Sequence, residues 1–101
     1  MISAVNSCRF VGKLKSRTIY KAEDLSWVLL RGILNLPSLE NENIGQNINI
    51  ISWNSVAERL LEVSEQQWIC IICSYSPSMF RDKLQDTFLV DSFSIVKNDE
   101  R

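Results

Sequence analysis

Histidine is absent from this chain of 101 residues, and glycine and proline are scarce, at three and two residues. Without histidine, the Ser-His and Cys-His pairs that activate many nucleophiles cannot form. The sequence also lacks a glycine-rich phosphate-binding loop. Its carboxylates fall in polar segments, where contact with water accounts for them. We therefore predict a protein that is not an enzyme and that binds no cofactor.

The three cysteines are too few for a structural metal site. Cys70 and Cys73 form a C-x-x-C pair, but their apolar neighbours indicate a strand, on which residues three apart point to opposite faces. Cys8 is the only other soft ligand, and a structural zinc ion needs four ligands. We predict three thiols that bind no metal and form no disulfide, as in a reducing compartment.

No apolar stretch is long enough to span a membrane as a helix, and the N-terminal segment lacks the basic and apolar regions of a secretory signal. We expect a protein that has no membrane partner and that works in the compartment where it is made. The length suits one domain with one core. We predict a core over residues 4–97, an exposed polar loop over 37–46 and a frayed tail over 98–101.

Apolar and polar residues alternate over much of the chain, which is typical of strands with one buried face. In the first such segment, Cys8, Phe10, Gly12 and Leu14 share a face, and Gly12 lies where a long strand can bend. Two further segments are nearly continuous apolar runs rich in residues that favour strands. The five predicted strands span residues 4–15, 25–34, 47–53, 68–75 and 87–97.

A short helix is predicted over residues 55–63, between the third and fourth strands. Ser55 and Glu58 have the spacing of a capping box, and apolar residues then recur at intervals of three and four. Residues 80–86 are charged and predict a turn before the last strand. Three strands, a helix and two strands are the order of the OB-fold, an all-β five-stranded barrel whose closure removes exposed strand edges.

Positive charge gathers in the first third of the chain, although the net charge of the whole chain is −1. Residues 1–35 carry six basic and two acidic side chains, a net charge of +4, whereas residues 36–101 carry five basic and ten acidic ones, a net charge of −5. This asymmetry predicts a local positive surface for a polyanion, and an ordinary solvated edge is the alternative. The candidate contacts to a phosphate backbone are Arg9, Lys13, Lys15, Arg17 and Arg31.

Three aromatic residues lie near polar neighbours at or beyond predicted strand ends: Trp53, Tyr75 and Phe80. Proteins that bind single-stranded nucleic acid combine a positive groove with aromatic rings on which bases stack. These three are therefore candidate stacking residues, with packing as the alternative. We expect Phe80 to be presented from a mobile loop. Trp27 and Trp68 lie within apolar runs and are predicted to pack in the core or against another subunit.

Two segments resemble the bacterial-type single-stranded-DNA-binding proteins. Residues 5–14, Val-Asn-Ser-Cys-Arg-Phe-Val-Gly-Lys-Leu, are similar to the first strand of that family, and residues 48–61 are similar to its third strand and following helix. The resemblance extends over residues 4–97 and implies an OB-fold in which Trp53 and Phe80 stack on bases. Asn47 stands near the position where the family has a further stacking tryptophan, so that platform is expected to be lost.

The leading hypothesis is therefore the binding of single-stranded DNA through a basic groove and stacking aromatics. The resemblance also implies a homo-oligomer assembled through the first strand. No residue pattern separates DNA from RNA as the ligand. A protein-interaction or accessory-subunit domain that has lost nucleic-acid binding is a further alternative, favoured by the low net charge and by Asn47. Similarity to short relatives encoded in algal plastid genomes implies a location in the plastid (chloroplast), with the cytoplasm as the alternative.

Overall fold

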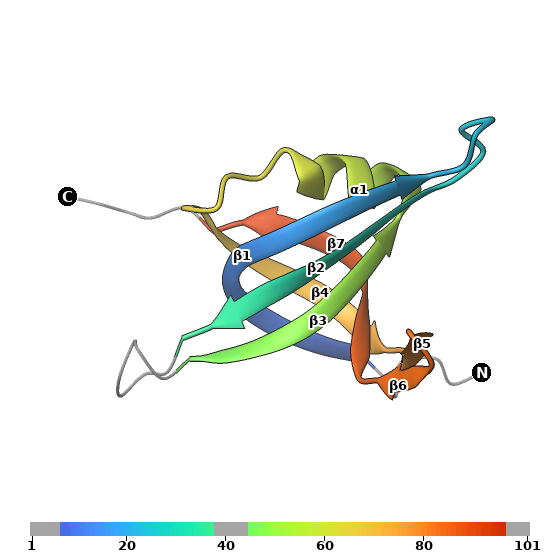
Figure 1. Ribbon diagram of the computed structural model, residues 1–101. Coiled ribbons are helices and arrows are strands. Elements are labelled where there is room, and N and C mark those ends of the chain that lie inside the picture. The colour runs from blue at the N-terminus through green and yellow to red at the C-terminus, as the bar shows by residue number, and fades with distance from the viewer. Residues whose placement is uncertain (1–6, 38–44, 97–101) are drawn as a thin grey trace.

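The computed structural model describes residues 7–37 and 45–96, and it consists mainly of strands (Figure 1). The predicted strand start at 4–6, most of the predicted loop 37–46 and the predicted tail 98–101 lie outside the described residues. In chain order, the elements are β1 (Ser7–Lys21), β2 (Val28–Leu36), β3 (Gln46–Trp53), α1 (Asn54–Leu61), β4 (Trp68–Tyr75), β5 (Ser78–Phe80), β6 (Lys83–Gln85) and β7 (Thr87–Ile95).

Five of these strands close into a barrel in the order β1-β2-β3-β7-β4. Neighbouring strands are antiparallel, except that β3 and β7 are parallel. The predicted all-β, five-stranded barrel with one helix between the third and fourth barrel strands is confirmed. Because the barrel interior is a packed core, a ligand has access to the outer surface and to the two ends.

β1 is longer than predicted, because it serves two neighbours. It ends at Lys21 instead of residue 15. Its first half pairs with β4 and its second half pairs with β2, with a register shift near the point where the two halves meet. Gly12 lies close to this crossing, where an added Cβ would be 2.3 Å from the carbonyl oxygen of Asn35. Glycine is needed here because a side chain would push β2 away from β1.

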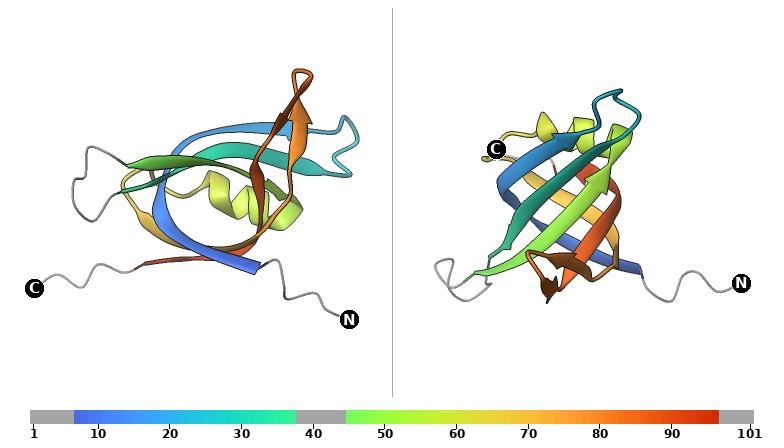
Figure 2. Two further views of the ribbon diagram at one scale, coloured as in Figure 1. Left: turned by 90° about the horizontal axis from the view of Figure 1, so that it is seen from below. Right: turned by 45° about the vertical axis from the view of Figure 1, so that its right-hand side comes forward.

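Inward-facing aliphatic side chains fill the barrel, and α1 covers one end of it (Figure 2). Ala57 and Leu60 of α1 are buried, and Val63 beyond the helix joins the same core. The largest fully buried strand side chains include Leu14, Leu30, Leu34, Ile50, Ile69 and Ile71. Alternate residues of the strands thus form the core, which leaves the other set of side chains for the outer surface.

α1 starts one residue earlier than predicted and without the expected capping box. Trp53 is the N-cap, with an extended backbone and no side-chain hydrogen bond to the first turn. Asn54 turns the chain with a φ of 55°. Ser55 therefore lies inside the first turn and is exposed, so the predicted Ser55–Glu58 box is wrong. No helix within residues 7–37 and 45–96 has the length and apolar character needed to cross a membrane.

The predicted charged turn at residues 80–86 is wrong in its extent, because this segment contributes to a small hairpin formed by β5 and β6. Phe80 pairs with Lys83, and the two residues between them, Arg81 and Asp82, have φ values of 54° and 65°. Positive φ at both central residues is the signature of a type I′ turn, which suits the twist of a two-stranded ribbon. The β1–β2 hairpin lies near the end of the barrel that α1 covers, and the β5–β6 hairpin lies near the opposite end (Figure 1).

Candidate nucleic-acid interface

One side of the barrel carries rows of outward-pointing side chains from β1, β2 and β3. Directly opposed residues on neighbouring strands share a face, and the register opposes Tyr20 to Leu29 and Leu29 to Trp53. Tyr20 and Trp53 are 41% and 43% exposed. Rigid strands therefore hold large aromatic rings half in solvent. We call this surface the outer face, and it consists of Thr18, Tyr20, Leu29, Arg31, Ile51 and Trp53.

Trp27 extends the outer face from the β1–β2 hairpin. Its ring lies edge to face against that of Trp53, with 6.0 Å between the centroids, and it is 41% exposed. A core position for Trp27 is wrong, because burial in β2 begins at the next residue, Val28, and contact with another subunit stays a prediction. The side-chain Oδ1 of Asn54 accepts a hydrogen bond from the N–H of Val28 at 3.0 Å. This bond ties the start of β2 to the end of β3 and so braces the tryptophan pair.

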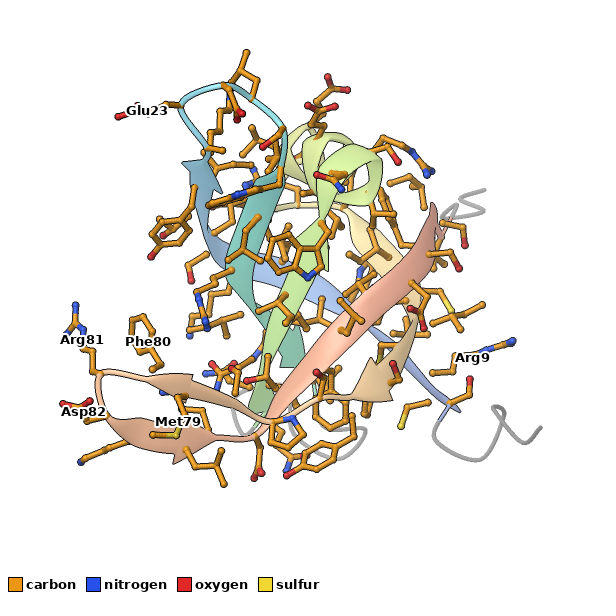
Figure 3. All side chains as sticks on the ribbon, turned by 90° about the vertical axis from the view of Figure 1, so that its right-hand side faces the viewer. Arg9, Glu23, Met79, Phe80, Arg81 and Asp82 are labelled. Atoms are coloured by element: carbon orange, nitrogen blue, oxygen red, sulfur yellow. The ribbon has the colours of Figure 1, made fainter. Side chains whose placement is uncertain are left out.

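Phe80 flanks the outer face from the β5–β6 hairpin (Figure 3). The guanidinium carbons of Arg31 and Arg81 lie 4.9 Å and 5.2 Å from the centroid of its ring, within the range of cation–π attraction. A groove of about 200 Å³ separates the hairpin from the barrel wall, and its lining includes Tyr20, Arg31, Asn49 and Phe80. A hairpin strand presents the Phe80 ring, so the prediction of a loop at this position is wrong.

Arg17 does not belong to the outer face. Its Nη1 donates hydrogen bonds to the carbonyl oxygen of Leu60, at 3.1 Å, and to that of Val63. Carbonyl groups at the C-terminal end of a helix lack partners within the helix, and a positive charge is favourable there. This guanidinium therefore holds α1 on the barrel, and the predicted contact between Arg17 and a phosphate backbone stays a prediction.

The other predicted cations do not gather in one groove. Arg9 lies on the side of the barrel away from Phe80 (Figure 3). Lys13 and Lys15 line a separate hollow of about 550 Å³. Arg31 is the one of these four that belongs to the outer face. The positive charge of the first third of the chain is thus distributed around the barrel, because β1 winds past two neighbours.

Asn47, where the resemblance predicts that a stacking platform is lost, also lines the hollow beside Lys13. Asn47 is exposed, and its Oδ1 accepts a hydrogen bond from Nδ2 of Asn35 at 2.9 Å. The Nζ of Lys13 lies 4.9 Å from the ring centroid of Trp68. Trp68 is half-buried on the outer side of β4. The prediction of a core position for Trp68 is therefore wrong, and contact with another subunit stays a prediction.

Tyr75 lies at the end of the barrel opposite α1 and not on the outer face. Its hydroxyl donates a hydrogen bond to Oδ1 of Asp86 at 2.5 Å, and its ring lies edge to face on Phe88. The hydrogen bond to this carboxylate raises the pKa of Tyr75 above its ordinary value of 10.0, because the bond requires the phenol proton. Tyr75 is 40% exposed, so its ring is accessible, but in a different hollow from Phe80.

Three residues of this interface, Tyr20, Trp27 and Arg81, are missing from the binding residues predicted from the sequence. Tyr20 is missed when the first strand is ended at residue 15, and the continued alternation of Thr18 and Tyr20 is the signal that identifies it. Arg81 lies in a segment read as a turn. No local pattern shows that this turn brings a guanidinium onto Phe80, because that contact depends on the hairpin.

The cysteines lie apart from the outer face. Cys70 is half-buried and Cys73 is fully buried, at positions of β4 that face opposite sides, as predicted. Burial raises the pKa of the Cys73 thiol from 9.0 to about 11, since an apolar environment disfavours the thiolate. Among the described residues, no three His, Cys, Asp or Glu side chains form a group that could hold a metal ion.

The closed barrel with this strand order and with a helix between β3 and β4 is an OB-fold, in which β5 and β6 extend the connection between β4 and β7. OB-folds bind oligonucleotides and oligosaccharides on the face of their second and third strands and on the loops that follow the first and fourth strands. The outer face, Trp27 and Phe80 occupy these positions.

Solved structures with a similar fold include the SSB domain of a Synechococcus protein, with a TM-score of 0.70 and 14% identity over 92% of this chain and 98% of that one. The N-terminal domain of PriB from Thermoanaerobacter tencongensis has a TM-score of 0.72 and 18% identity over 92% and 98%. The single-stranded DNA binding protein from Thermus aquaticus has a TM-score of 0.76 and 12% identity over 100% of this chain and 46% of that one. No family model and no curated protein matches the sequence. At these low identities, the structural likeness establishes the fold. It confirms in structure the resemblance predicted from the sequence.

Proposed function

We propose that this protein binds single-stranded DNA on its outer face and catalyses no reaction. The observation that carries the proposal is the row of half-exposed rings, Tyr20, Trp53 and Trp27, beside Arg31 and Phe80. Stacking of a base on an aromatic ring contributes about 1–3 kcal/mol. The single-stranded DNA binding protein of Thermus aquaticus shares the fold, which supports this choice of ligand.

Arg31 and Arg81 supply the positive charge for a phosphate backbone next to Phe80. A guanidinium can stack its flat side on a ring while its N–H groups point to an oxyanion. Local contacts must provide the attraction, because a net charge of −1 gives the whole molecule no long-range pull on DNA. The proposed complex therefore depends on stacking together with a small number of phosphate contacts.

The test compares Arg31→Gln with Arg9→Gln, because each removes one positive charge but only Arg31 lies on the outer face. Anisotropy of labelled oligo(dT) at two or more salt concentrations measures the affinity and its salt dependence. We expect Arg31→Gln to weaken binding about tenfold, which corresponds to about 1.4 kcal/mol, and Arg9→Gln to bind with an affinity near that of the wild type.

Equal losses of affinity in both variants would contradict the assignment to the outer face. Absence of wild-type binding would contradict the function. Tighter binding of oligo(U) of the same length would assign RNA as the ligand.

A second surface favours association with another copy of the chain. On the outer side of β1 and β4, Val11 is 47% exposed and lies opposite the half-buried Cys70, and half-buried Ile72 lies opposite Arg9. Apolar groups left in water on a strand face favour protein contact, and the PriB domain of the same fold is described as dimeric. Sedimentation velocity should show a dimer that Val11→Glu converts to a monomer. A wild type that stays monomeric at high concentration would contradict this proposal.

A further inference from the structure

A hollow of about 580 Å³ opens at the end of the barrel opposite α1, where β3 begins. We call it the barrel mouth. Three aromatic rings from three strands form part of its lining: the rings of Phe10 and Tyr75 lie 5.2 Å and 5.6 Å from that of Phe88, both edge to face. Such a cluster presents apolar ring surface against which another flat ring can pack.

The remainder of the lining is mostly polar. Asp86 provides a carboxylate, whose Oδ1 accepts the hydrogen bond from Tyr75. A carboxylate can accept several hydrogen bonds, and a carboxamide offers both a donor and an acceptor. Four carboxamides line the mouth: Gln46, Asn47, Asn49 and Gln85. The barrel mouth therefore suits a flat ligand that has hydrogen-bonding groups along its edge.

The charge of the barrel mouth selects the part of a nucleotide that can enter. Asp86 is the charged group among the described residues that line it, and none of them is a lysine or an arginine. A phosphate would be repelled by the carboxylate, whereas an uncharged base would not. Asp and Glu accept hydrogen bonds from the exocyclic amino group of cytosine. Thymine has no such group and can offer only its ring N3–H, which is flanked by two carbonyl oxygens that the carboxylate repels.

The barrel mouth is adjacent to the groove below the β5–β6 hairpin, because Asn49 and Gln85 line both. The Nδ2 of Asn49 donates a hydrogen bond to the backbone carbonyl of Asp86 at 3.4 Å, which links β3 to the end of the hairpin. A strand that lies against Arg31 and Phe80 therefore passes the entrance of the mouth. Single strands are recognised through bases that are splayed out of the stack and read along their edges.

We propose that the barrel mouth takes one unstacked base of a bound strand and favours bases with an exocyclic amino group (cytosine, adenine and guanine) over thymine. This inference rests on the proposed function, because the strand must first lie on the outer face. The aromatic cluster then provides a surface for the base, while Asp86 and the carboxamides read its edge. The protein would thus combine stacking that tolerates any sequence with one position that discriminates between bases.

The test compares the affinity of the wild type for an oligo(dT) and for the same oligonucleotide with cytosines placed at intervals. We expect the cytosine-containing strand to bind about tenfold more tightly. Asp86→Ala should abolish this ratio, whereas Asp82→Ala, which removes the same charge at the exposed hairpin turn, should keep it. Both variants lose one negative charge, so the ratio of the two affinities separates the barrel mouth from the general attraction to DNA.

Free deoxycytidine provides a second measurement, because it has no phosphate and does not need the outer face. We expect it to shift the side-chain amide NMR signals of Asn49 and Gln46 without moving the indole signal of Trp53. Equal affinity for both oligonucleotides, or an Asp86→Ala variant that keeps the preference, would overturn the inference and leave the proposed function intact. If deoxycytidine shifts the amide signals but no strand binds, the proposed function would be overturned. The inference that the mouth takes a base of a bound strand would then be overturned as well.

Discussion

Trp53 connects the fold to the proposed site more directly than any other residue of the outer face. Its extended backbone ends β3 and forms the N-cap of α1, while its ring is 43% exposed and rests on Trp27. The backbone position depends on Asn54, whose side chain bonds to the N–H of Val28. The Trp53 ring can therefore be removed without removing the contacts that hold the turn between β3 and α1.

Trp53→Ala should weaken binding to oligo(dT) by about tenfold or more, because stacking is worth about 1–3 kcal/mol per base. The melting temperature should change little, since nearly half of the ring is already in solvent. Thermal unfolding and anisotropy are measured on the same samples, with Trp53→Phe as the conservative control. A large loss of melting temperature with unchanged affinity would show that the ring serves packing.

Cys73 should resist alkylation by iodoacetamide at pH 8. The thiolate is the reactive form, and the buried thiol has a pKa of about 11. The pKa is raised in the folded state, so the stability contributed by the protonated thiol is present below pH 9 and is lost as the pH rises from 9 toward 11. Mass spectrometry of native and urea-unfolded protein compares the rates, and equal rates would contradict the burial of this side chain. Cys73→Val should lose less stability than the wild type over the same pH range.

At the scale of elements, α1 is held by a cation from β1. Arg17 reaches the carbonyl groups of Leu60 and Val63, where the helix ends. The interaction joins an element predicted from periodicity to a strand 43 residues earlier in the chain. A local sequence pattern cannot show such a contact. The sequence alone therefore predicts that Arg17 is a surface cation.

Arg17→Ala should destabilise the protein by about 1–3 kcal/mol, because hydrogen bonds to charged groups are worth about 1.5–3 kcal/mol. Urea unfolding gives the free-energy difference, and Lys15→Ala is the matched control, since Lys15 is exposed and surface substitutions usually stay within about 0.5 kcal/mol. Affinity for oligo(dT), measured on folded protein, should be unchanged. If Arg17→Ala kept its stability but lost affinity, the result would support the phosphate contact predicted from the sequence.

The β5–β6 hairpin shows what local pattern misses at this scale. Arg81 and Asp82 both adopt positive φ, which most type I′ turns reserve for asparagine and glycine. The sequence offers neither residue here, so a charged turn is the natural interpretation. Two interactions outside the turn support the hairpin. β5 pairs with β6, and Phe80 contacts Arg31 of β2.

For the whole molecule, binding should be weak and should fall as salt rises. The logarithm of affinity against the logarithm of salt should have a slope of about −1.5 to −3, as expected for roughly two to four phosphate contacts at about 0.7 per contact on a single strand. Arg31→Gln should reduce this slope by about 0.7. A flat slope would mean that phosphates are not engaged and would favour a protein-interaction role.

The fold was largely predictable, whereas the site was predictable only in part. Alternation in 4–15, 47–53 and 87–97 identified barrel strands because each has one face in the core. Trp53 was expected beside polar neighbours at a strand end, and it is 43% exposed, while the roles of Trp53 and Arg31 in binding stay predictions. The sequence did not identify the exposure of Tyr20 and Trp27, since it depends on how far β1 continues and on where burial in β2 begins.

The sequence by itself determined the number and order of the barrel strands, the position of the helix and the lack of histidine-dependent chemistry. These properties follow from residue identity and short-range periodicity. Tertiary structure decided where the cations lie. β1 pairs first with β4 and then with β2, so its cations face different sides of the barrel. Arg9 points away from the proposed site and Arg17 binds α1, whereas Arg31 on β2 meets Phe80. Closure of the barrel, which no local pattern specifies, converts a run of positive charge into separate contacts.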